Sequence, residues 1–216
     1  MSKELNKILD LIKKKDLNSA KELCYQVKNL EDNFHFQNTF GYLLYEFGEI
    51  NEAIKKWQIT VRMNPEYFYA YSNLGNAFEK IGKFKNAIEN FNKAIEIKPD
   101  YFEAYYGLGN VQFKMSKLED ALSNLDKAIQ LRPDYQPALK SKLMLQRKMG
   151  RSQEALETLN LLISNDSTDA GLLFDKGQLL SELGRKNEAI TSYKNTYLLD
   201  QNFPFTLGYL VEAKLN

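Results

Sequence analysis

The stretch from residue 68 to residue 101 reads FYAYSNLGNAFEKIGKFKNAIENFNKAIEIKPDY, and the next 34 residues, 102–135, read FEAYYGLGNVQFKMSKLEDALSNLDKAIQLRPDY. The two segments align without a gap, so the chain repeats itself. The same step of 34 residues joins the alanines Ala53, Ala87, Ala121, Ala155 and Ala189. A fixed period of this length is typical of a repeat architecture, in which each repeat is one supersecondary unit.

The apolar residues within one repeat are spaced as on two helices. In the first half, Tyr71, Leu74 and Phe78 follow the i, i+3, i+7 pattern of one helix face. The second half continues it with Phe84, Ala87, Ile88, Phe91, Ala94 and Ile95. Gly82 between the halves predicts a turn, and Pro99 predicts a stop before the next helix. Each repeat is therefore predicted to be a helix–turn–helix.

Small residues at fixed positions predict where helices come close together. We expect Gly75 and Ala87 to lie where the two helices of a pair approach, and Ala94 where the next pair docks. A second glycine column predicts the turns; it contains Gly48, Gly82, Gly150 and Gly184 and is broken only by Ser116. Cys24 falls in a column of large residues with Trp57, Phe91, Leu125, Leu159 and Tyr193, which predicts a buried thiol.

The repeat resembles the tetratricopeptide repeat family. The family pattern of a large aromatic residue, Leu-Gly, an aromatic residue, Ala, an aromatic residue and Pro is matched by Tyr71, Leu74, Gly75, Phe78, Ala87, Phe91 and Pro99. The resemblance implies an all-α fold, a right-handed superhelical solenoid of six helix pairs with one further helix over 204–215. The repeats are expected at 1–33, 34–67, 68–101, 102–135, 136–169 and 170–203, in one domain that spans 1–216.

Composition excludes several classes of function. Twenty-nine Lys and Arg residues oppose 28 Asp and Glu residues, for a formal net charge of +1, so no nucleic-acid or membrane partner is expected. Cys24 and His35 are the only residues of their types, which excludes a disulfide framework and a zinc site. No apolar run reaches membrane length, and Met1–Lys15 lacks the features of a secretory signal. We expect a cytoplasmic protein with no catalytic residues, metal or cofactor.

The resemblance also implies that the first helix of each pair lines a concave groove, where a protein or peptide partner would bind. Asn76 and Asn110 fall in one column there, and an asparagine amide can pair with the backbone of an extended peptide. Lys140 and Arg147 belong to a stretch, 136–153, that contains five cations and no acid. They would attract a carboxylate or another acidic group of the partner. The aromatic residues expected beside these four are Tyr106, Phe113 and Phe174.

The same groove residues allow two other interpretations. The cations could form an ordinary solvated helix face that is balanced by acids elsewhere. One group of the family grips chaperone carboxylates with two Lys, two Asn and an Arg. Asn76, Asn110 and Lys140 match that pattern, whereas Ser72 and Met144 depart from it.

The last segment, 203–215, is apolar on more than one face and carries only Glu212 and Lys214 as charges. A terminal repeat needs a polar outer face, so we expect this helix to self-associate or to be covered by further protein. The segment is also similar to one in bacterial relatives of O-linked N-acetylglucosamine transferase, through Pro204, Leu207, Leu210, Ala213, Lys214 and Leu215. The function predicted first is a protein–protein interaction module, a scaffold that binds a peptide in its groove. The alternative is the acceptor-recognition region of such a glycosyltransferase, with the catalytic domain beyond this chain.

Overall fold

The computed structural model describes residues 2–165, 168–204 and 207–209, and these residues form helices and connections without any strand. The first helices in chain order are α1 (Lys3–Lys13), α2 (Leu17–Gln26), α3 (Phe34–Glu46), α4 (Ile50–Met63), α5 (Phe68–Lys80) and α6 (Phe84–Ile97). They are followed by α7 (Phe102–Lys114), α8 (Leu118–Leu131), α9 (Gln136–Lys148), α10 (Ser152–Asn165), α11 (Ala170–Glu182) and α12 (Lys186–Leu199). The predicted all-α class is confirmed.

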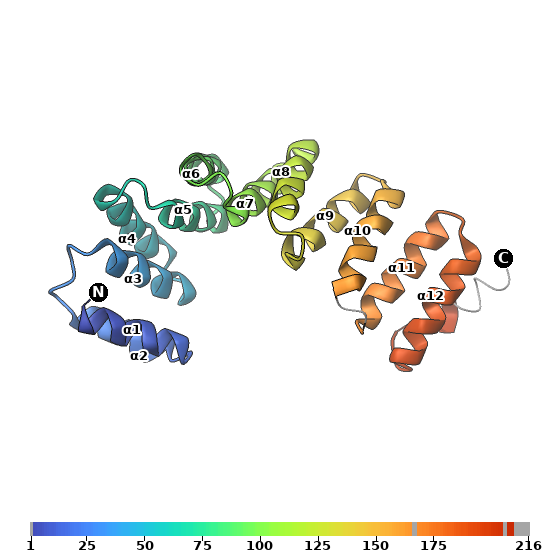
Figure 1. Ribbon diagram of the computed structural model, residues 1–216, viewed down its shortest axis with the longest axis horizontal. Helices are drawn as coiled ribbons and strands as arrows, with labels where there is room; N and C mark the ends of the chain where they lie inside the picture. The colour runs from blue at the N-terminus through green and yellow to red at the C-terminus, as the bar shows by residue number, and fades with distance from the viewer. Residues whose placement is uncertain (1, 166–167, 205–206, 210–216) are drawn as a thin grey trace. The chain divides into compact units, whose positions relative to one another are not determined.

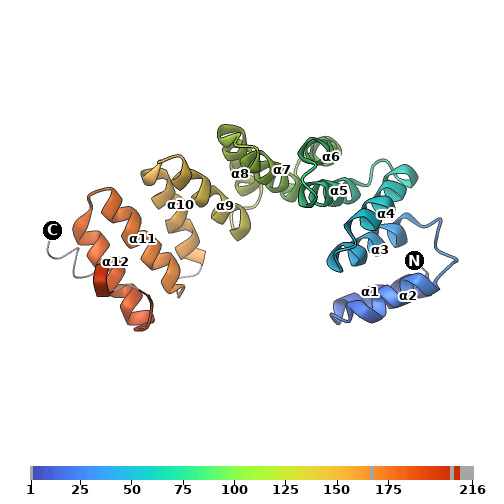
Figure 2. The same ribbon diagram turned by 180° about the vertical axis from the view of Figure 1, so that it is seen from behind.

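The helix boundaries follow the predicted repeats. The first helix of the second to sixth repeats begins on the first residue of the predicted range, at Phe34, Phe68, Phe102, Gln136 and Ala170. Within each of the two units described below, successive helices pack on one another, from α1 to α7 and from α8 to α12, in the manner of a tetratricopeptide solenoid. Figure 1 and Figure 2 show this succession of helices from opposite sides.

The chain forms two compact units, Met1–Met115 and Ser116–Asn216, and each is described by itself. The first contains α1–α7 and the second α8–α12. The single domain over 1–216 stays a prediction. The further helix expected over 204–215 lies mostly outside the described residues. Of that range, 207–209 are helical, and the ring of Tyr209 lies 5.4 Å from that of Tyr193.

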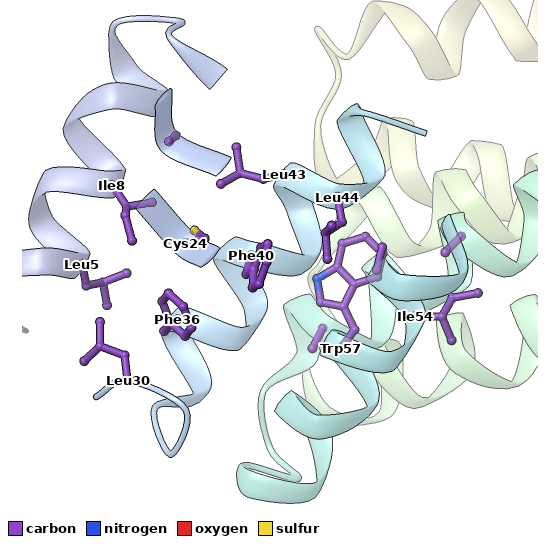
Figure 3. Packing of buried hydrophobic residues seen from close by; sticks show 14 of the residues in the cluster. Leu5, Ile8, Cys24, Leu30, Phe36, Phe40, Leu43, Leu44, Ile54 and Trp57 are labelled. Carbon is purple, nitrogen blue, oxygen red and sulfur yellow. The ribbon is translucent and has the colours of Figure 1, made fainter. Parts of the chain in front are cut away.

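The hydrophobic core of the first two repeats surrounds Cys24 (Figure 3). Its thiol is buried as predicted, and burial raises the thiol's pKa to about 12, so the group is unreactive at neutral pH. Cys24 is small where the second, third and sixth repeats carry an aromatic ring. Phe36 of the same cluster is large where the matching positions are Ala70 and Ala104.

The glycines in the turns have a backbone reason. Gly48, Gly82, Gly150 and Gly184 have φ between 70° and 80°, the left-handed region that side chains disfavour. Ser116 takes the same conformation with φ 60°, and so does Lys15 in the first repeat with φ 61°. After Gly82 the chain closes the helix with a bond from the Lys83 amide to the Phe78 carbonyl, 2.8 Å long. The turn geometry is thus kept even where the glycine is absent.

Glycines inside the first helices make room for large side chains. A Cβ atom at Gly41 would lie 2.7 Å from the Trp57 ring, and one at Gly177 would lie 2.3 Å from the Tyr193 ring. The fifth repeat has Leu143 in this column, and its partner position holds the smaller Leu159. The predicted close approach at the glycine column is therefore confirmed for Gly41 and Gly177.

The ring of Phe91 makes this contact with two glycines. A Cβ atom would lie 2.7 Å from its ring at Gly75 and 2.4 Å from it at Gly107, so the ring is held between two glycine backbones. We expect Gly75→Ala to lower the free energy of unfolding. Overpacking costs about 1–3 kcal/mol, which exceeds the gain in helix propensity of at most about 1 kcal/mol. Chemical denaturation measures the difference.

The matching control is the double variant Gly75→Ala/Phe91→Leu, which reproduces the kind of exchange seen at Leu143 and Leu159. It should lose less stability than the sum of the two single changes, with a coupling of about 0.5 kcal/mol or more. If the losses of unfolding free energy in the two single variants simply add in the double variant, the contact between Gly75 and Phe91 is contradicted.

Ser116 generates a second prediction. A side chain in the left-handed region costs about 1–2 kcal/mol, while glycine loses about 0.5–1 kcal/mol of backbone entropy on folding. Ser116→Gly should therefore raise the melting temperature modestly. The control Ser123→Gly makes the same change of residue in the interior of a helix, on the exposed face of α8. It should lower the melting temperature. The same direction of change in both variants would refute the backbone argument.

Candidate functional site

The predicted asparagines lie on adjacent helices of the first unit. Asn76 on α5 and Asn110 on α7 are both half-buried. One turn beyond them, the Lys114 ammonium lies 2.8 Å from the Glu79 carboxylate, so this ion pair joins the same faces of the two helices. Two amides are thus presented along neighbouring first helices of the repeats.

The aromatic residues predicted beside Asn110 share its helix. Tyr106 and Phe113 stand four residues before it and three after it on α7, and both are half-buried. Ser72, one helix turn before Asn76, is 3 % exposed and so is not offered to a ligand. In the second repeat, the Asn38 amide oxygen accepts a bond from Asn73, 3.2 Å long, which joins α3 to α5.

The predicted cations lie in the second unit, on α9. Lys140 is exposed and forms no ion pair among the residues that the structure describes. Arg147, two turns further, donates to the carboxylate of Asp175 at 3.5 Å and to the amide oxygen of Gln178 at 3.4 Å, both on α11. Lys140 is thus the more available of the two charges.

Two other cations of the basic stretch are neutralised by neighbouring helices. Lys142 lies 2.6 Å from Asp126, and Arg151 lies 2.5 Å from Glu119. The acids come from α8, about 16 and 32 residues earlier in the sequence. For these two residues the interpretation as a balanced helix face is correct.

Phe174, the last predicted residue, is half-buried among other rings. Its ring centroid lies 5.2 Å from that of Phe203, 5.2 Å from that of Tyr209 and 5.7 Å from that of Tyr193. Edge and tilted contacts of this kind stabilise packing by about 0.5–1.5 kcal/mol beyond area burial. Phe174 therefore contributes to the packing of the last repeat.

Among the described residues, two clefts lie away from the predicted site residues. One of about 360 Å³ opens between α2, α3 and α4, over a floor that includes Cys24, Phe36 and Phe40. The other, of about 350 Å³, lies at the α9–α10 turn beside Glu182. None of the seven predicted residues lines either cleft. Sequence reasoning missed the first cleft, although the long connection from Val27 to Asn33 is a signal that the repeats are spaced differently there.

No metal centre is formed in the described ranges, since no three His, Cys, Asp or Glu side chains gather there. None of the helices described is both long enough and apolar enough to cross a membrane.

Comparison with known sequence families identifies the architecture. The TPR repeat family matches residues 41–82 and 80–116, and the tetratricopeptide repeat matches residues 102–135 and again 170–203. Together these matches cover more than half of the chain. The chain belongs to the tetratricopeptide repeat family.

Solved structures agree with that fold. YrrB, described as a TPR protein with an unusual peptide-binding site, is 19% identical with a TM-score of 0.66, over 86% of this chain and 93% of its own. A structure of MamA is 23% identical with a TM-score of 0.68, over 78% and 92%. PilF of Pseudomonas aeruginosa is 14% identical with a TM-score of 0.77, over 97% and 96%. At these identities the likeness is one of fold alone.

No curated protein matches the sequence. The resemblance of the last segment to glycosyltransferases receives no support from the family matches or from these structures.

Asp175 beside Arg147 allows a test of the electrostatics of this face. Burial raises the pKa of Asp175 above its usual value, although Arg147 opposes the shift. The folded state therefore binds a proton more readily than the unfolded state, and stability is lost as the pH rises through the acid range. An asparagine at position 175 does not titrate, so the variant does not lose stability in this way as the pH rises. We expect the melting temperature of Asp175→Asn, relative to that of the unmodified protein, to rise between about pH 3 and pH 7.

Glu188 provides the control with the opposite sign. Its hydrogen bond with Arg185 lowers its pKa, so it contributes stability at neutral pH that is lost in acid. Relative to the unmodified protein, Glu188→Gln should therefore become slightly less stable as the pH rises. Parallel pH profiles for the unmodified protein and Asp175→Asn would show that Arg147 fully compensates the burial.

Proposed function

We propose that this chain is a protein-interaction module that binds an extended peptide along the first helices of its repeats. Tetratricopeptide scaffolds are generally non-catalytic, and we propose no chemistry for this chain. The observation that carries the proposal is the pair of half-buried amides, Asn76 and Asn110, on two neighbouring helices that are joined by an ion pair one turn further on. YrrB, a protein of the same fold, is described as having a peptide-binding site, which is consistent with this role.

In this proposal the amides pair with the ligand backbone, because each can both donate and accept. In the first unit, Tyr106 and Phe113 pack beside the ligand. In the second unit, taken by itself, Lys140 attracts an acidic group of a ligand and Phe174 packs beside it. Arg147 contributes less, because Asp175 and Gln178 already share its guanidinium.

Affinity capture followed by mass spectrometry identifies the partner, and titration of the captured segment tests the site. A charge-assisted contact contributes about 1.5–3 kcal/mol, so Lys140→Ala should weaken binding about tenfold or more. A neutral hydrogen bond contributes about 0.5–1.5 kcal/mol, so Asn110→Ala should weaken binding about two- to tenfold. The titration is done at about 0.15 M salt, where a merely nearby charge is screened. The melting temperature should change little, since Lys140 is exposed and Asn110 is only half-buried.

Lys127→Ala is the matched control for the lysine, because Lys127 is exposed on α8 and donates to the exposed side chain of Gln130. It should leave the affinity unchanged. Unaltered binding by both Lys140→Ala and Asn110→Ala would place the ligand elsewhere, and the exposed Tyr42 with Tyr45 on α3 would then be tested next.

A further inference from the structure

A continuous chain of ring contacts runs across the amino-terminal ends of α3, α5 and α7. We call it the aromatic strip, and it consists of Phe34, His35, Tyr67, Phe68, Tyr69 and Tyr101. The Tyr67 ring lies 5.2 Å from Phe34 and 5.6 Å from Tyr69, and Tyr69 in turn lies 5.5 Å from Tyr101. His35 lies 5.6 Å from Tyr67. The strip thus extends over the second and third repeats, up to the residue that precedes α7.

Two rings of the strip are open to solvent. Tyr69 is 46% exposed, and His35 is exposed as well. The other rings are half-buried and hold these two in place. Aromatic rings held rigidly at a surface can bind a ligand at little cost in conformational entropy.

Acidic residues accompany the strip in each connection. Glu31 and Asp32 precede α3 and Glu66 precedes α5; all three are exposed and form no ion pair among the described residues. Before α7, Asp100 is paired with Lys98 at 2.9 Å. The connections before α3 and α5 therefore place exposed acids next in sequence to the rings of the strip, and Lys93 on α6 interacts electrostatically with one of them, Glu66.

The spacing of the strip is set by helix packing. Contacts between Asn38 and Asn73 and between Glu79 and Lys114 show that α3, α5 and α7 are direct neighbours. Packed helices lie about 8–10 Å apart. A polyproline II helix advances about 3.1 Å per residue with three residues per turn, or about 9 Å per turn. Successive turns of such a helix would therefore meet successive repeats of the strip.

We propose that the aromatic strip binds a proline-rich segment that carries Lys or Arg and takes the polyproline II conformation. Proline rings pack on Tyr69 and its neighbours, in the way that aromatic-lined surfaces recognise such segments. The cationic side chains lie over the ring faces and toward Glu31, Asp32 and Glu66. Tyrosine hydroxyls can donate to the carbonyl groups of the segment, which are unpaired in this conformation. The inference does not depend on the groove proposed above, because it uses different residues.

The test uses the full chain and a fluorescent peptide with four repeats of Pro-Pro-Arg, titrated by anisotropy. Two peptides of the same length serve as comparisons. A Pro-Pro-Glu peptide should not bind, because it meets the acids. A Gly-Ser-Arg peptide keeps the charge without the polyproline conformation and should bind at least about fivefold more weakly. No binding of the Pro-Pro-Arg peptide, or equal binding of the two basic peptides, would overturn the proposal.

Variants locate the contact. Tyr69→Ala should weaken the Pro-Pro-Arg complex about fivefold or more, whereas Tyr69→Phe keeps the ring and should retain most of the affinity. Tyr25→Ala removes another exposed tyrosine of the same unit, 59% exposed on α2, and should have no effect. Equal affinity of Tyr69→Ala and the unmodified protein, with both folded by melting temperature, would refute the site.

Asn110→Ala separates this proposal from the previous one. It should leave the Pro-Pro-Arg complex intact while it weakens the complex with the captured groove partner. Weakening of the Pro-Pro-Arg complex by Asn110→Ala but not by Tyr69→Ala would assign the peptide to the groove and overturn the strip as its site.

Discussion

The ring of Phe91 lies between the backbones of Gly75 and Gly107, and contacts of this kind set how closely successive helices approach. A helix pair cannot bury its apolar face alone, so it depends on such close approach to its neighbours. The fifth repeat has neither the glycine nor the ring, and Leu143 and Leu159 lie together in one core cluster there. The fourth repeat keeps Gly109 although its partner position holds Leu125. The small residue is therefore kept in four of the five repeats from the second to the sixth, and a large ring packs against it in three of them.

This constraint falls on the inner side of each helix and leaves the opposite side free to vary. Positions such as Asn76 and Asn110 do not contribute to the packed columns, while Ser72 and Gly75 on the same helix do. Binding residues can thus change from repeat to repeat without loss of stability. The same separation explains why changes at the proposed ligand contacts are expected to alter affinity but not melting temperature.

The 34-residue period predicts the fold in detail, including the first residue of the helices at Phe34, Phe68 and Phe102. The glycine column also predicts the turns, although Lys15 and Ser116 take the same left-handed conformation without a glycine. The partners of single charges could not be predicted. Arg151 meets Glu119 across 32 residues, and that contact depends on side-chain reach between helices. The stretch 136–153 is therefore uniformly basic in sequence, although several of its charges are paired in space.

The aromatic strip shows how packing and recognition can share one set of residues. Phe34, Tyr67 and Tyr101 are half-buried at the junctions between repeats, where they hold the connections against the next helix. Because the junctions recur at the helix spacing, the rings recur at that spacing as well. A periodic surface of rings arises from the repeat itself, and exposure of Tyr69 and His35 turns part of it outward. A ligand with a matching period needs no further adaptation of the scaffold, since the spacing that it recognises is the one that packing already imposes.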